Sequence, residues 1–236
     1  MLDNGLDRRT LLATGGTMMA LAATGAGAAA PAAPVAVAPS YTPKPLPFDP
    51  KSVGWLSEKL LTSHHDNNYV GAVKRLGQIR AAFASLDPAT APGFQVNGLK
   101  REELIAWNSM ILHELYFGGF GPASAPGQSL ARAIERDFGS HDRWAAEFTA
   151  MGKALGGGSG WVILTWSHRD QQLTNQWAAD HSMALAGATP LLVMDLYEHA
   201  YAMDFGAKAA AYVDGFMKAL SWKQADALFA RAAGSA

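Results

Sequence analysis

The spacing of the apolar residues changes near residue 156, and this change limits which folds the chain can adopt. Over residues 54–83, and again over 100–117, apolar side chains recur at the spacing of amphipathic helices. Residues 156–160 read Gly-Gly-Gly-Ser-Gly, and the run Trp-Val-Ile-Leu-Thr-Trp at 161–166 has strong strand propensity. Helical segments followed by a few short strands predict an α+β protein.

Breaker-rich segments divide the chain further. Glycine and proline between residues 86 and 98 separate the first two helices, so we predict an N-terminal helical hairpin domain over 46–125. Over 126–236 we predict an α/β domain that contains two helices before the sheet. In it, 172–177 pairs back on the first strand, 190–195 adds a third, and helices resume at about residue 198. The expected fold class is therefore α+β, a helical hairpin plus a three-stranded antiparallel sheet with helices.

The N-terminus carries a second kind of signal. Arg8 and Arg9 precede a short, weakly apolar run at 11–23, and small residues follow it. This pattern is typical of a twin-arginine export signal, which we assign to residues 1–30, with a Pro- and Ala-rich linker or arm over 31–45. With such a signal, we expect the protein to be periplasmic or otherwise exported, and to have no membrane attachment once the signal is cleaved. The alternative is a basic start on a cytoplasmic protein.

Composition excludes several functions. The net charge is −1, which argues against an extended basic surface and against a nucleic-acid partner. The chain contains no cysteine, so disulfides, thiolate nucleophiles and iron–sulfur clusters are excluded. A transition metal would therefore be bound by imidazole nitrogen and carboxylate oxygen, for which seven histidines are available.

Several histidines and one aspartate have the spacing of metal ligands. Asp195 and His199 stand four residues apart, which allows either a buried Asp–His hydrogen bond or half of a metal site. His113 lies on an apolar helix face and is a core histidine or a ligand. His64 and His65 point about 100° apart on a helix, so at most one reaches a shared centre. Three imidazoles and one carboxylate would suit iron or manganese.

Three motifs together indicate a family. Residues 195–201 read Asp-Leu-Tyr-Glu-His-Ala-Tyr, residues 158–161 read Gly-Ser-Gly-Trp, and 133–140 read Ala-Ile-Glu-Arg-Asp-Phe-Gly-Ser. From about residue 44 to 233 the chain resembles the iron/manganese superoxide dismutases, with tyrosine in place of tryptophan in the first motif. The resemblance implies conversion of superoxide to dioxygen and hydrogen peroxide at one Fe or Mn ion per subunit. It implies these metal ligands: His64, His113, Asp195 and His199.

The first helix departs from the family pattern, because one histidine pair precedes the Tyr-Val dipeptide where the family usually has two. One alignment matches Tyr69 to the family tyrosine and leaves Leu61 at the ligand position. The other matches His64 to the ligand and places Asn68 at the gateway histidine and Ala72 at the gateway tyrosine. We adopt the second, because it keeps a complete ligand set. Tyr69 is then expected to fill part of the substrate funnel.

The group that contacts the metal-bound solvent is also unusual. The resemblance places a glutamine or histidine there, but the second-helix position holds Ser109, which is too short. His181 and Gln176 remain on the strand side, and we favour His181.

The resemblance further implies a homodimer. In the family, the equivalents of Glu198 and Tyr201 reach across the interface towards ligands of the partner.

Because Ala72 and Ser109 depart from the pattern, an alternative function stays open. The chain would then be a metal-binding relative with little or no dismutase activity and a structural or interaction role. The sequence does not choose between iron and manganese.

Overall fold

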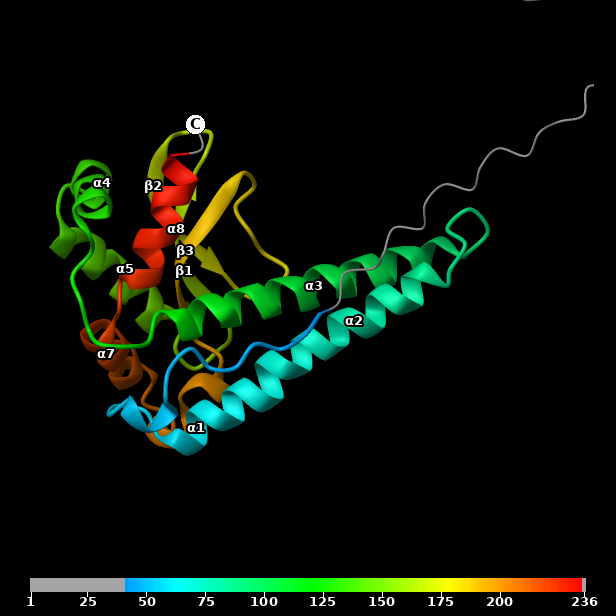
Figure 1. Ribbon diagram of the computed structural model, residues 1–236, viewed down its shortest axis with the longest axis horizontal. Coiled ribbons are helices and arrows are strands. Elements are labelled where there is room, and N and C mark those ends of the chain that lie inside the picture. The colour runs from blue at the N-terminus through cyan, green and yellow to red at the C-terminus, as the bar shows by residue number, and fades with distance from the viewer. Residues whose placement is uncertain (1–40, 235–236) are drawn as a thin grey trace, which may run out of the picture. The chain divides into compact units, whose positions relative to one another are not determined.

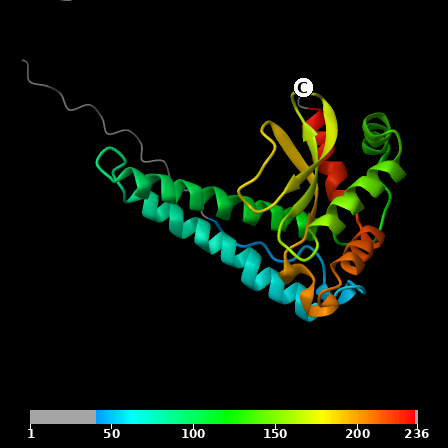
Figure 2. The same cartoon turned by 180° about the vertical axis from the view of Figure 1, so that it is seen from behind.

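The computed structural model describes residues 41–234 (Figure 1). The expected export signal at 1–30 lies outside the described residues. The N-terminal part is a helical hairpin, as predicted, and its elements are η1 (Pro50–Ser52), α1 (Glu58–Ser63), η2 (His64–Tyr69), α2 (Val70–Ala84) and α3 (Gly93–Gly118). Figures 1 and 2 show α2 and α3 side by side along their lengths. Leu76 and Ile79 of α2 pack against Ala106 of α3, which holds the two helices together.

The hairpin's first arm is interrupted by a wider turn. Segment η2 is a π-helix, in which the Val70 N–H bonds to the His65 carbonyl five residues earlier. Such a turn takes up one extra residue and rotates the helix that follows it. Upstream, Ser57 caps α1 by accepting a hydrogen bond from Leu60 N at 3.1 Å. The chain therefore enters η2 with a fixed direction.

The sheet has three antiparallel strands in the order β2-β1-β3, which confirms the predicted fold class. The strands are β1 (Trp161–Ser167), β2 (Gln172–Ala178) and β3 (Ala188–Asp195). Every residue of β1 is buried, because this apolar strand lies between the other two. Trp161 pairs with Ala178 on one side and with Asp195 on the other. The start of β1 is thereby placed beside the end of β3.

Helices cover the sheet and complete the core. They are α4 (Gln128–Phe138), α5 (His141–Leu155), η3 (Glu198–Ala200), α6 (Ala202–Phe205), α7 (Ala209–Ala219) and α8 (Lys223–Ala233). Helix α8 packs on β3 and β1, α5 packs on β1 and α7, and α3 lies against β3 (Figure 1). None of the helices in the described part of the chain is both long and apolar enough to cross a membrane. The predicted boundary between residues 125 and 126 stays a prediction.

Candidate metal centre

Four side chains from separate elements converge on one point. His64 comes from η2, His113 from α3, Asp195 from the end of β3 and His199 from η3, and one ligand atom of each lies within 4.8 Å of the others. Asp195 Oδ2 is 3.2 Å from His64 Nε2, 3.2 Å from His199 Nε2 and 3.7 Å from His113 Nε2. The structure thus brings together all four residues that the resemblance implied as ligands.

The polar atoms of this cluster are poorly satisfied by the protein alone. His64, His113 and Asp195 are buried, and the His199 side chain is 25% exposed. Within residues 41–234, both ring nitrogens of His64 and Nε2 of His113 have no hydrogen-bond partner. His64 Nε2 lies near Asp195 Oδ2 without the alignment of a hydrogen bond. An unsatisfied buried polar group costs about 1–3 kcal/mol, and a cation among these atoms would remove most of that cost. The residues present therefore fit a metal ion.

Burial also sets the charges of the cluster. It lowers the pKa of His113 to about 3 and holds the pKa of His64 below its ordinary value, so both rings are neutral and keep a lone pair. Burial alone would raise the pKa of Asp195, but the hydrogen bond with His199 and the close approach of His64 hold that pKa well below its usual range. Neutral imidazoles and one carboxylate give a nitrogen and oxygen set of charge −1, which suits iron or manganese.

A main-chain carbonyl orients His113. Its Nδ1 donates to the Ser109 carbonyl oxygen, one turn earlier on α3, at 2.6 Å. With the proton on Nδ1, the lone pair of Nε2 faces the centre. Ser109 thus contributes through its backbone at a position where its side chain is too short to reach the solvent site.

A tight turn after β3 presents the carboxylate. Asp195 Oδ1 accepts a hydrogen bond from Tyr197 N at 2.8 Å, which leaves Oδ2 facing the three imidazoles. Leu196 N donates to the Gly160 carbonyl at 3.0 Å, so the turn is fastened to the start of β1. Local hydrogen bonds therefore fix Asp195 and bring η3, with His199, over the same point.

His181 lies beside the centre, in a wall of aromatic rings. Its ring is 6.1 Å from that of His113 and stacks on that of Tyr197 at 4.9 Å. Trp161 Nε1 donates to His181 Nδ1 at 3.1 Å, which leaves the proton of the neutral ring on Nε2. Burial lowers the pKa of His181, which favours this neutral form. Asn108 holds the segment by donating to the His181 carbonyl at 2.7 Å.

The other two predicted catalytic residues make their hydrogen bonds elsewhere. Gln176 Oε1 accepts from Leu185 N at 3.1 Å, within the segment that joins β2 to β3. The Tyr69 hydroxyl donates to Glu114 Oε1 at 3.0 Å and accepts from Lys44 N at 2.9 Å. The structure does not bring these groups to the four-residue cluster, and their part in a reaction stays a prediction.

One contact of the cluster was missed by sequence reasoning. The Asn68 amide lies 3.0 Å from His199 Nδ1, although the sequence gave Asn68 only a place at the gateway. The available signal was its distance of four residues from His64, which places both on one side of a helix. Nothing in the sequence showed that His199 lies opposite.

The two residues expected at a dimer interface differ in their surroundings. Tyr201 is buried within its own chain, where its hydroxyl accepts from Gly157 N at 3.3 Å and its ring stacks on Tyr212. Glu198 is exposed on η3. Glu198 is therefore the member of this pair that is free to meet a partner.

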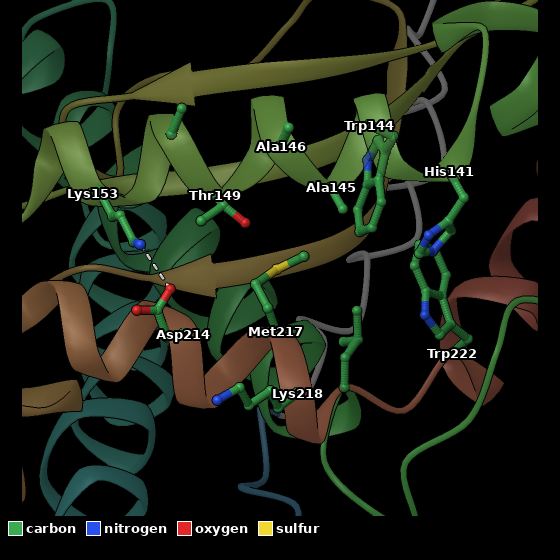
Figure 3. Close-up of a pocket in the computed structure, with 12 residues that line it drawn as sticks. His141, Trp144, Ala145, Ala146, Thr149, Lys153, Asp214, Met217, Lys218 and Trp222 are labelled. Atoms are coloured by element: carbon green, nitrogen blue, oxygen red, sulfur yellow. Dashed lines mark ion pairs between the residues drawn. The ribbon is translucent and has the colours of Figure 1, made fainter.

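The cluster is separate from a wider hollow between α5 and α7. Figure 3 shows this hollow, of about 610 Å³, with Lys153 and Asp214 joined by an ion pair of 2.8 Å. His141 and Trp222 stand at its other end. None of its lining residues belongs to the four-residue cluster.

Comparisons with known proteins agree with this geometry. A family model described as iron/manganese superoxide dismutases, C-terminal domain, matches residues 126–228. A protein named Superoxide dismutase [Fe] from Cupriavidus metallidurans is 62% identical over 192 residues, which is 81% of this chain and 98% of the relative. Superoxide dismutase [Mn] 1 of Halobacterium salinarum is 32% identical, covering 82% and 96%. Superoxide dismutase [Fe] of Aquifex aeolicus is 31% identical, covering 78% and 88%.

Proposed function

The chain belongs to the iron/manganese superoxide dismutase family, and we propose that it converts superoxide into dioxygen and hydrogen peroxide at one iron or manganese ion. The observation that carries this function is the meeting of three imidazole nitrogens and one carboxylate oxygen around a single point. In the balanced reaction, two superoxide ions and two protons give one dioxygen and one hydrogen peroxide. The relative with 62% identity is named as an iron enzyme, which favours iron.

The residues of the site fall into three groups: metal ligands, a proton donor and the aromatic rings around them. His64, His113, Asp195 and His199 would hold the ion, and their charge of −1 partly balances it. When bound, the ion supplies a one-electron acceptor and donor at the point that superoxide reaches. His181 holds a proton on Nε2 beside the cluster, where the second half of the reaction consumes protons. The rings of Trp161 and Tyr197 pack beside the His181 ring and exclude water from it.

The alternative, a metal-binding relative without activity, is not favoured. It was suggested by Ala72 and Ser109, but Ser109 orients a ligand through its carbonyl and His181 supplies the donor that a glutamine would give. Serine at position 109 therefore removes neither a metal ligand nor the hydrogen-bond partner of His113.

Superoxide consumption by the metal-loaded protein tests the function. We expect the iron-loaded or the manganese-loaded chain to consume superoxide catalytically, because either ion can change its charge by one. The zinc-loaded chain is the control, since zinc occupies the same kind of site without redox chemistry. Equal rates for the zinc-loaded and the iron- and manganese-loaded chains would refute the proposed reaction.

We also propose that the protein is exported to the periplasm by the twin-arginine route, which carries folded proteins. The support is the Arg8-Arg9 pair before a short apolar run, and a ligand set drawn from segments far apart in the chain. Such a set forms only once the chain is folded.

Cell fractionation in a Gram-negative host measures this export. We expect the double variant Arg8→Lys, Arg9→Lys to keep its activity but to stay in the cytoplasmic fraction, while Arg132→Lys, as a control, reaches the periplasm. An unchanged distribution of the double variant would contradict export by this route.

We further propose a homodimer, supported by the exposed position of Glu198 on η3, next to ligand His199. Sedimentation of the metal-loaded chain decides it, and a monomer at micromolar concentration would refute it.

A further inference from the structure

A methionine sulfur closes the turn that carries His181. In the segment between β2 and β3, Ala179 N donates to Met183 Sδ at 3.3 Å, so this hydrogen bond spans His181. Within the turn, Asp180 Oδ1 accepts from Ser182 N at 2.7 Å and from Ser182 Oγ at 2.6 Å. His181 is therefore the middle residue of the turn 179–183, whose two ends are joined through a thioether.

The position of this turn matters to the metal centre, because it sets where the His181 ring lies. That ring is 6.1 Å from the ring of His113, and its Nδ1 accepts from Trp161 Nε1 at 3.1 Å. Asn108 donates to the His181 carbonyl oxygen at 2.7 Å. These contacts come from other segments, whereas the contact that closes the turn itself comes from Met183.

Small molecules in solution can reach the Met183 side chain. Met183 is 37% exposed, whereas Met194 on β3 is fully buried. Met203, on α6, is also exposed, but it lies outside the turn. Met183 thus combines access from solvent with a sulfur atom that accepts a hydrogen bond from the backbone.

Hydrogen peroxide, the product of the proposed reaction, oxidises such a sulfur by transfer of one oxygen atom. An S–O bond forms on Met183 and the O–O bond of the peroxide breaks. The sulfur gives up two electrons and becomes a sulfoxide, and the peroxide is reduced to water. Thioether and peroxide balance this step between them, so it needs neither the metal nor a further reactant.

Oxidation changes the contact that closes the turn. A thioether is apolar and flexible and its sulfur is a weak acceptor, whereas a sulfoxide is polar and accepts through its oxygen. The acceptor for Ala179 N then lies one bond farther out on Met183, and the turn must open or shift to keep the hydrogen bond. A shift of the turn moves His181 relative to Trp161 and His113.

We propose that Met183 is a peroxide-sensitive modification site: its oxidation to the sulfoxide displaces the turn that holds His181 and slows the enzyme. The proposal rests on the proposed function for the source of the peroxide and for the rate that falls. The oxidation of Met183 and the change in the turn do not depend on that function. Because methionine sulfoxide reductases reduce the sulfoxide, the effect is reversible.

The test treats the manganese-loaded, full-length chain with hydrogen peroxide, since manganese avoids the radical chemistry of iron with peroxide. After catalase has removed the peroxide, peptide mass spectrometry gives the sulfoxide at each methionine, and hydrogen exchange gives the protection of residues 178–183. We expect Met183 to be oxidised well before Met194 and exchange at 178–183 to rise. The rate of superoxide consumption should fall about 10-fold, the low end of the cost of disturbing the groups around a metal site. Methionine sulfoxide reductases A and B together should reverse all three changes.

Two variants serve as controls. Met183→Leu has no sulfur at this position, so it is expected to keep its own starting rate through the peroxide treatment. Met203→Leu removes the exposed methionine outside the turn, and it should lose activity as the unaltered chain does.

The outcomes separate this inference from the function beneath it. The inference is wrong if Met183 stays reduced while Met203 is oxidised, or if exchange at 178–183 or the rate is unchanged in the Met183 sulfoxide. It is equally wrong if Met183→Leu loses its rate as fast as the unaltered chain, because the damage then arises elsewhere. An untreated chain that holds its metal but consumes no superoxide would instead refute the proposed function. Sulfoxide mapping and hydrogen exchange would still decide whether oxidation of Met183 alters the turn.

Discussion

Replacing Asp195 with asparagine is expected to abolish both metal binding and superoxide consumption in a protein that still folds. The substitution keeps the shape and the oxygen that accepts from Tyr197 N, but it removes the one negative charge of the ligand set. Loss of a hydrogen-bond partner of a ligand costs about 10–100-fold in metal affinity, and loss of a charged ligand should cost more than about 100-fold. Metal content after dialysis against a chelator, with the rate of superoxide consumption, measures the effect.

The matched control for this change is Asp226→Asn. Asp226 also accepts hydrogen bonds from a backbone N–H, that of Gly127, but it lies outside the cluster. We expect it to keep metal and activity. If Asp195→Asn kept its metal as well, the carboxylate could not be a ligand, and the assignment of the site would be wrong.

Substituting Gly160 with alanine should destabilise the fold by about 3 kcal/mol or more, among the larger effects of a single change. Gly160 has φ of +138°, and a Cβ there would lie 2.4 Å from the backbone oxygen of Ala178. That oxygen belongs to the β1–β2 pairing and cannot retreat without opening the sheet. Because the Gly160 carbonyl also accepts from Leu196 N, metal affinity should fall too. Urea unfolding of the metal-free protein measures the loss of stability.

Gly157→Ala separates the backbone conformation from the clash. Gly157 also has a positive φ, +86°, but a Cβ there would meet no atom within 4 Å. We expect it to cost about 1–2 kcal/mol, the penalty of a left-handed conformation alone. Equal losses for the two variants would show that the Ala178 oxygen can move and that the approach of β1 to β2 is not tight.

The sheet and the hairpin could be predicted from local sequence, because the apolar residues within each segment show either the helical or the strand pattern, and not a mixture of the two. The apolar run at 161–166 forms a strand, as expected, and the structure shows it to be the buried, central one; the third strand begins at Ala188 rather than at 190. The helix expected from about residue 198 is instead the short η3 followed by α6, because Tyr201, with φ of −148°, interrupts it. Such an interruption depends on the burial of Tyr201 against Tyr212, which no local pattern contains.

The first helix shows more clearly what local sequence does not predict. A continuous helical period over 54–83 predicts one helix, whereas the structure has a π-turn at η2 that adds a residue and changes which side chains face inward. His64, at the start of this turn, faces the other three ligands, while the hydroxyl of Tyr69, at its end, bonds to Glu114. The pairing of Asp195 with His199 was readable from four-residue spacing. The contact of Asn68 with His199 was not, because it joins segments 131 residues apart.

The assignment of the four metal ligands is tested most directly by anomalous X-ray diffraction at the iron and manganese absorption edges. The crystals would contain the protein purified with its native metal. We expect one anomalous peak per chain, within bonding distance of Nε2 of His64, His113 and His199 and of Oδ2 of Asp195. A peak elsewhere, or a His64 ring turned away from the other three ligands, would contradict it.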